Sequence, residues 1–189
     1  KIDDCIIVTK GAAIEGTAIL STELADELLQ VNVDRKIVQR AQEFIKMISV
    51  VKDALTAVEV GGVHAMHDAT EGGIAGGLQE IAWASDVGIM AYEDRIHIYD
   101  ETEAICKALN IDSLKTISSG ALIISAHPEK AEEIVTTLQN KGIPTSIIGK
   151  VVDRREGSYI FRRDGTKLDL SQPITEELWS ALERHGIKA

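Results

Sequence analysis

Four glycines within one expected helix restrict most strongly how this chain can fold. They follow Asp68 closely and lie before a helical stretch that continues to residue 85: Gly72, Gly73, Gly76 and Gly77. A glycine in a helix interior costs about 1 kcal/mol relative to alanine. A sequence tolerates this cost where another backbone or a ligand approaches closely. Tight packing on a sheet explains the glycines, and so does a ligand phosphate at the start of the helix; both can hold together.

Apolar runs of strand length alternate with helical patterns along the chain. The runs predict strands at residues 5–8, 63–66, 88–92, 121–126 and 145–152, and a hairpin around residues 164–165. Helices are expected at residues 17–29, from a cap at Asp34 to residue 51, and at 101–109, 128–140 and 174–184. With the glycine-rich helix, this predicts one α+β domain over residues 1–189, a mixed sheet with helices packed on it.

Charge and composition argue against several classes of protein. The net charge of −10 is unfavourable for binding nucleic acid, because phosphate contacts need clustered lysine and arginine. No apolar run approaches the roughly 18 residues of a membrane span, and no signal peptide is visible. Cys5 and Cys106 lie in apolar contexts without metal-ligand spacing. We therefore expect a cytoplasmic protein with buried thiols, no metal site of its own, and no nucleic-acid or membrane partner.

Two turns at strand ends are candidates for binding an anion. In the loop of residues 9–17, Gly11, Gly16 and Thr17 can present backbone amides at a helix start. The lysine that a P-loop has before its threonine is missing, and a plain turn is the alternative. In a second turn, Ser118, Ser119 and Gly120 can hydrogen-bond a ligand where a strand begins.

The start of the glycine-rich helix is the strongest candidate site. Asp68 or Thr70 is expected to cap the helix. Asp68 is also a catalytic candidate that orients the substrate or a magnesium-bound phosphate, and Thr70 with the amides of Gly72 and Gly73 is a candidate for binding an oxyanion. His67, next to Asp68, is a candidate for proton transfer, with a purely structural histidine as the alternative. Metal binding by His64 and His67 is disfavoured, because their spacing puts them on opposite faces of a strand.

These residues resemble a known family. Asp68 to Gly73, followed by Glu80, resembles the carboxy-domain signature shared by aminoimidazole ribonucleotide synthetase (PurM), selenophosphate synthetase, thiamine-monophosphate kinase and HypE. Met66 and Glu80 fit the HypE variant best. Further segments follow in the family's order, so the resemblance extends over residues 5–152: Ser119-Gly120-Ala121-Leu122, His127-Pro128-Glu129 and Ile147-Ile148-Gly149-Lys150-Val151.

The resemblance implies a PurM C-terminal domain-like fold and a role in ATP-dependent chemistry. In the family, an amino-terminal domain dimerises and supplies most contacts to ATP and Mg²⁺, and an amide-type or similar oxygen is activated by phosphoryl transfer. The HypE branch implies nickel–iron hydrogenase maturation and a maturation protein as partner. Because this chain starts at Lys1 and its first methionine is Met47, we expect a fragment whose ATP-binding domain lies upstream.

The sequence also departs from HypE. Glu71 stands where HypE has arginine, Ser119 stands where it has glutamate, and the terminal cysteine that carries the substrate in HypE is missing. These departures leave two alternatives open. One is a different synthetase or kinase of the superfamily that phosphorylates a small molecule, and the other is a catalytically silent interaction scaffold.

Overall fold

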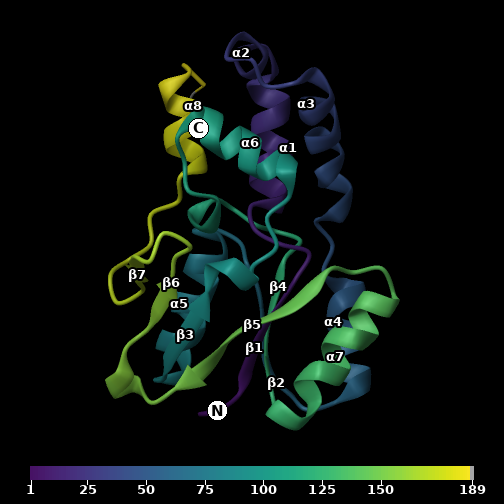
Figure 1. The fold of residues 1–189 in the computed structure, drawn as a ribbon, viewed down its shortest axis with the longest axis vertical. Helices are drawn as coiled ribbons and strands as arrows, with labels where there is room; N and C mark the ends of the chain where they lie inside the picture. Colours follow the sequence, from purple (N-terminus) through teal and green to yellow (C-terminus); the bar gives the residue numbers. More distant parts are fainter. Residues whose placement is uncertain (188–189) are drawn as a thin grey trace.

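The computed structural model describes residues 1–187, and its centre is a mixed β-sheet (Figure 1). Within these residues seven strands lie in the order β2-β4-β1-β5-β3-β6-β7. Neighbouring strands are antiparallel, except that β3 and β6 are parallel. The predicted mixed sheet is confirmed, with these strands: β1 (Cys5–Thr9), β2 (Val63–Asp68), β3 (Gly88–Tyr92), β4 (Leu122–Ala126), β5 (Thr145–Val152), β6 (Tyr159–Phe161) and β7 (Lys167–Asp169).

Helices cover both faces of the sheet and form a separate group beyond one end of it (Figure 1). One face is covered by α5 (Gly73–Ser85), and the other by α4 (Val51–Val60) and α7 (Pro128–Asn140). The helices of this separate group pack their leucine and isoleucine side chains together in a third buried cluster. It consists of α1 (Ile14–Glu23), α2 (Ala25–Gln30), α3 (Arg35–Gln42), α6 (Asp100–Leu109) and α8 (Leu178–Arg184).

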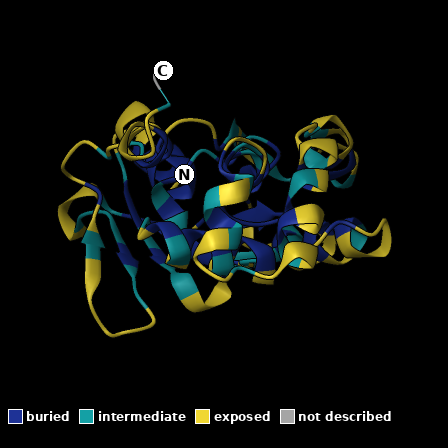
Figure 2. Ribbon diagram, turned by 90° about the horizontal axis from the view of Figure 1, so that it is seen from above, coloured by how far each residue is buried: buried dark blue, intermediate teal, exposed yellow. Residues whose placement is uncertain are grey.

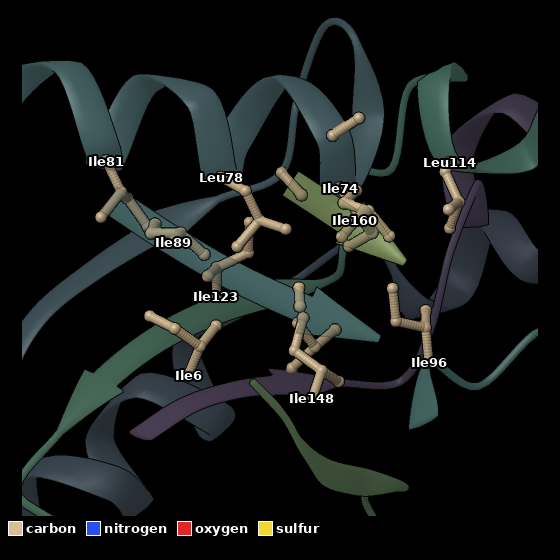
Figure 3. Close-up of a cluster of buried hydrophobic side chains, with 14 of the residues drawn as sticks. Ile6, Ile74, Leu78, Ile81, Ile89, Ile96, Leu114, Ile123, Ile148 and Ile160 are labelled. Carbon is tan, nitrogen blue, oxygen red and sulfur yellow. The ribbon is translucent and has the colours of Figure 1, made fainter. Parts of the chain in front are cut away.

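The position of strand β1 in the middle of the sheet explains why its sequence is a continuous apolar run. Ile6 and Val8 pack in the cluster under α5, whereas Ile7 packs in the cluster under α4 and α7. A strand buried on both faces needs apolar side chains at successive positions rather than at alternate ones. Figure 3 shows α5 placing Leu78 and Ile81 over the sheet residues of the first cluster, and Figure 2 shows the buried layer between exposed helix surfaces.

The long helix predicted from residue 34 to 51 is wrong. Asp34 caps its start as expected, with the side chain accepting a hydrogen bond from the amide of Lys36. The helix then ends at residue 42 and continues as a 3₁₀ turn, η1 (Glu43–Met47), before α4 begins. The predicted apolar stripe is therefore only partly buried: Phe44 packs in the core, whereas Ile45 and Val51 are 48% and 62% exposed.

Other helix predictions also differ from the structure, and the single helix predicted at residues 17–29 is divided at Leu24 into α1 and α2. Helix α1 begins at Ile14, three residues early, because Ala13 adopts a left-handed conformation and the chain turns sharply there. Helix α8 begins at Leu178, four residues late, because residues 170–177 are held as a strap by hydrogen bonds to other elements. Buried Gln79, for example, donates to the carbonyls of Leu170 and Gln172.

The glycines of the α5 segment are explained by close packing. A Cβ at Gly73 would lie 2.5 Å from the carbonyl oxygen of Thr116, and a Cβ at Gly77 would lie 2.7 Å from the side chain of Ile123 on β4. A Cβ at Gly76 would lie 2.6 Å from the carbonyl oxygen of Glu71. The backbone of α5 therefore approaches its neighbours more closely than a side chain permits.

Candidate functional site

Asp68 is the last residue of β2, at the edge of the sheet, and lies half-buried beside the turn that leads into β4. The amide of Gly120 donates a long hydrogen bond of 3.4 Å to its carboxylate. Burial raises the pKa of Asp68 and the charge of Glu15 adds to the rise, whereas the Gly120 amide, His67 and Lys10 oppose it. Asp68 is therefore a carboxylate whose charge the folded protein disfavours, as is common in functional sites.

His67 and His64 lie on the same strand and have different partners. The imidazole of His67 pairs with the carboxylate of Glu80 on α5, next to Asp68. His64 Nδ1 lies 2.8 Å from a carboxylate oxygen of Asp4. The contact with Glu80 fixes the orientation of the His67 ring. His67 and Asp68 are neighbours on β2, but their side chains point to opposite faces of the sheet, because His67 lies opposite Ile123 and Asp68 lies opposite Leu122.

The mouth of α5 is occupied by a carboxylate of the protein itself. Glu176, in the strap, accepts hydrogen bonds from the amides of Gly72 (2.7 Å), Ile117 (3.1 Å) and Leu178 (2.7 Å). The amide of Gly73 donates to the carbonyl of Thr70 at 3.0 Å. The expected cap from Asp68 or Thr70 is therefore wrong, because α5 begins after Gly72 and its capping carboxylate comes from a distant segment. A ligand oxyanion at Gly72 has to displace Glu176.

The loop that contains Gly11, Gly16 and Thr17 is closed by internal hydrogen bonds. The Gly11 amide donates to Thr9, the Gly16 amide donates to Ile117, and the hydroxyl of Thr17 pairs with that of Thr102. All of these predicted phosphate-binding residues are buried. A phosphate could use them only by breaking these bonds, so the structure moves the candidate site away from this loop and toward Asp68.

The residues of the second turn, Ser118 to Gly120, differ in burial and in hydrogen-bond partners. Ser118 is fully buried, and its hydroxyl accepts from the amide of Ala13 (2.5 Å) and donates to the carbonyl of Thr116. Ser119 is half-buried, and Gly120 is buried with its amide directed at Asp68. Ser119 and Gly120 are therefore the members of this turn that lie next to the site, whereas Ser118 ties two loops together.

Lys10 and Asp53 form a buried ion pair that the sequence analysis did not find. Lys10 Nζ lies 2.9 Å from Asp53 Oδ1, and the two side chains are 11% and 2% exposed. The same ammonium donates to the carbonyls of Ser49 (2.9 Å) and Gly120 (2.6 Å). A lysine at the end of a buried apolar strand was the available signal, but its partner lies 43 residues away in a helix that was not predicted.

The described part of the chain contains no complete metal site. Among residues 1–187, no group of three or more histidine, cysteine, aspartate or glutamate side chains could hold a metal ion. Burial raises the pKa of the Cys106 thiol to about 12, so that cysteine is a core side chain. In the same part of the chain, the helices are too short or too polar to cross a membrane.

The fold and the match to a family model place the chain in a known class of proteins. The family model of the AIR synthase related protein, C-terminal domain, matches residues 1–162, and the chain belongs to that family. Its similar proteins include HypE, the carbamoyl dehydratase of Escherichia coli, at 27% identity over 177 residues, which cover 93% of this chain and 49% of HypE. A hydrogenase expression/formation protein of Methanocaldococcus jannaschii is 29% identical over 94% of this chain and 58% of its own length.

Solved structures show the same fold. E. coli HypE superimposes with a TM-score of 0.72 at 26% identity, over 92% of this chain and 52% of that chain. T. maritima PurL, solved with AMPPCP, superimposes with a TM-score of 0.61 at 15% identity, over 93% of this chain and 26% of that chain. The chain thus spans about half the length of the HypE proteins that it matches.

Proposed function

We propose that this chain is the carboxy-terminal domain of a HypE-like enzyme that activates an amide-type oxygen by phosphoryl transfer from ATP. The observation that carries the proposal is the arrangement at the end of β2, where half-buried Asp68 accepts a hydrogen bond from the Gly120 amide and the neighbouring His67 pairs with Glu80. The family membership and the similarity to carbamoyl dehydratases support it. A HypE structure in complex with ATP has this fold, at a TM-score of 0.70 and 22% identity.

Each residue has a distinct part in this proposal. Asp68 orients the substrate or a magnesium-bound phosphate, and His67 carries a proton between the reacting oxygen and solvent. Thr70 is exposed beside them, so its hydroxyl can donate to a phosphate oxygen. Asp68 and Glu15 alone are too few to enclose Mg²⁺, which prefers six oxygen ligands. We therefore propose that a preceding domain holds most of the ATP and Mg²⁺.

An exposed apolar face suggests where such a domain packs. Val51, Leu55 and Val58 form one stripe on α4 and are 62%, 60% and 55% exposed. Val58 also lines a shallow groove with Met66 of the edge strand β2, which is 38% exposed. A contiguous apolar surface of this kind marks an interaction site. We propose that the preceding domain of the longer protein covers it.

Hydrogen exchange tests this interface. In the longer protein, amides of α4 and β2 are expected to exchange more slowly than in the 189-residue chain, while those of α7 serve as the control. Equal exchange of α4 and β2 in the two proteins would place the preceding domain elsewhere.

Enzyme assays of the longer protein test the reaction. With ATP and a carboxamide substrate, Asp68→Asn is expected to lower turnover at least about tenfold, because a charged group at the reacting centre is lost. Asp86→Asn is the matched control, since Asp86 lies at the opposite end of α5 in a surface pair with Arg154. ATP consumption that is independent of any carboxamide, or unchanged by Asp68→Asn, would contradict the proposal.

One observation favours a second candidate, a scaffold without catalysis. Glu71 and Ser119, which depart from HypE, both lie at the mouth of α5, and exposed Glu71 adds negative charge where a phosphate would approach. A solved complex pairs HypE with HypF, at 22% identity to this chain. The scaffold proposal predicts that the longer protein binds a hydrogenase maturation protein but not ATP. Calorimetric titration with ATP distinguishes the two candidates.

A further inference from the structure

We infer that Lys10, held by Asp53, is the positioning residue of the Asp68 site. Its ammonium holds the Gly120 turn in the place where the amide of that turn meets Asp68. The importance of this device for catalysis rests on the proposed function. The device itself is defined by contacts and can be tested on the chain alone.

The ammonium of Lys10 is fully used. It has three N–H donors, and its three acceptors are the carbonyl of Ser49, the carbonyl of Gly120 and the carboxylate of Asp53. Lys10 also adopts a left-handed conformation, with φ of 59°, which residues with a side chain rarely do. The surrounding structure therefore fixes both its backbone and its side chain.

Asp53 is anchored equally well. Its Oδ1 accepts from the hydroxyl of Thr9 at 2.7 Å as well as from Lys10. The same hydroxyl accepts from the amide of Leu122, the first residue of β4, at 3.1 Å. The pair thus connects the end of β1, the first turn of α4 and the start of β4.

Gly120 is the link from this pair to Asp68. Its carbonyl accepts from Lys10, and its amide donates to Asp68. Its φ is 106°, and a Cβ there would lie 2.7 Å from the carbonyl oxygen of Met47 and 2.9 Å from the Cα of Ile48. The turn is therefore packed against the segment before α4, and Lys10 fastens both to the end of β1.

A purely structural role does not account for this choice of residues. Replacing a buried ion pair with apolar side chains of similar size is often neutral or stabilising, so such a pair is a poor device for stability alone. Here the positive member is linked to Asp68 through Gly120, and its charge acts on that carboxylate. The charged groups that act on Asp68 come from three segments: His67 on β2, Glu15 on α1 and Lys10 after β1.

Carboxyl NMR titration of Asp68 and exchange of the Gly120 amide test the inference in the 189-residue chain. Lys10→Met leaves Asp53 buried without its charge partner and is expected to compromise folding. The double variant Lys10→Met/Asp53→Asn removes both charges and keeps the shapes, so it is the informative variant. In it we expect Asp68 to titrate at higher pH and the Gly120 amide to exchange about tenfold faster or more.

Lys130→Met is the matched control, because Lys130 forms a surface pair with Glu133 on α7. An unchanged Asp68 titration and Gly120 exchange in the double variant would overturn the inference, whatever the enzyme assay gives. In the longer protein, the inference also requires the double variant to lower kcat more than it raises KM. If the NMR changes occur but the longer protein consumes no ATP, the proposed function fails, whereas the positioning role of Lys10 is still supported.

Discussion

Helices α5 and α7 are both 13 residues long and lie on opposite faces of the same sheet, yet they begin in opposite ways. Helix α7 starts with Pro128 in its first turn, and the ring of His127 accepts from the amide of Glu129. Helix α5 starts after Gly72 in a left-handed conformation, and the acceptor for the Gly72 amide is Glu176. The first start is encoded by neighbouring residues and the second by tertiary contacts.

The difference shows where the molecule departs from local preference. Helix α7 has a proline in its first turn, a capping residue directly before it and a glycine shortly after its end, all within its own stretch of sequence. Helix α5 contains glycines, starts after Gly72 in a left-handed conformation, and depends on a carboxylate of the strap at its start. Asp68 precedes the helix, and His67 contacts Glu80 on its side. Conflict between local and global preference is expected at functional sites, and here it is concentrated at one end of one helix.

Adding a methyl group at the start of α5 is expected to have the largest effect. In Gly73→Ala the new Cβ meets the carbonyl oxygens of Thr116 and Leu114 at 2.5 and 2.8 Å, and φ is 60°. We expect a loss of about 3 kcal/mol or more in the free energy of unfolding, measured with urea. Gly142→Ala, after α7, has φ of 77° with open space around it and should lose only about 1 kcal/mol. Equal losses would show that backbone conformation alone requires the glycines.

Removing the distant cap should have the next largest effect. Glu176→Ala leaves the amides of Gly72 and Ile117 without their acceptor, at an expected cost of about 2 kcal/mol. His127→Ala on α7 should cost less than about 1 kcal/mol, because its hydrogen bond to Glu129 is long, 3.3 Å, and exposed. Urea unfolding of both variants checks the order, and a larger loss for His127→Ala would reverse the comparison.

Neutralising Asp68 is expected to stabilise the protein slightly. Because folding raises the pKa of Asp68, its protonated form contributes stability that is complete below the usual carboxyl pKa and is lost as pH rises through the raised value. Asp68→Asn should therefore raise the melting temperature at pH 7, and the gain should vanish at acidic pH. A loss of stability at pH 7 would show that the carboxylate has favourable partners in the folded state.

The smallest effect is expected for the pair of His67 and Glu80. The Glu80 side chain is 58% exposed, so Glu80→Gln should change stability by no more than about 0.5 kcal/mol. Glu133→Gln on α7, whose partner is Lys130, should change it by a similar amount. The two variants should differ in the NMR signals of the His67 ring, which only Glu80→Gln is expected to change, because Glu80 is the partner of that ring.

The sequence was sufficient wherever the signal was local. The strands, α7 with Pro128 and Gly142, and the placement of Asp68 and His67 at a helix entry followed from neighbouring residues. The pairs Lys10–Asp53 and Gly72–Glu176 did not, because residues 43 and 104 positions apart meet only in the folded chain. Ser118 and Thr17 have the composition of ligand-binding turns, yet internal partners consume their hydroxyl groups, and composition cannot reveal that.

The distance in sequence between Gly72 and Glu176 has a consequence for how the domain is made. During synthesis, α5 can pack on the sheet before the strap has left the ribosome. Until then the amide of Gly72 lacks its acceptor, Glu176. The matched family region ends at residue 162, so a fragment cut at that boundary lacks Glu176 and the carbonyls that Gln79 holds. Such a truncated protein would keep the six strands β1 to β6 but lose β7 and the closure of the proposed site.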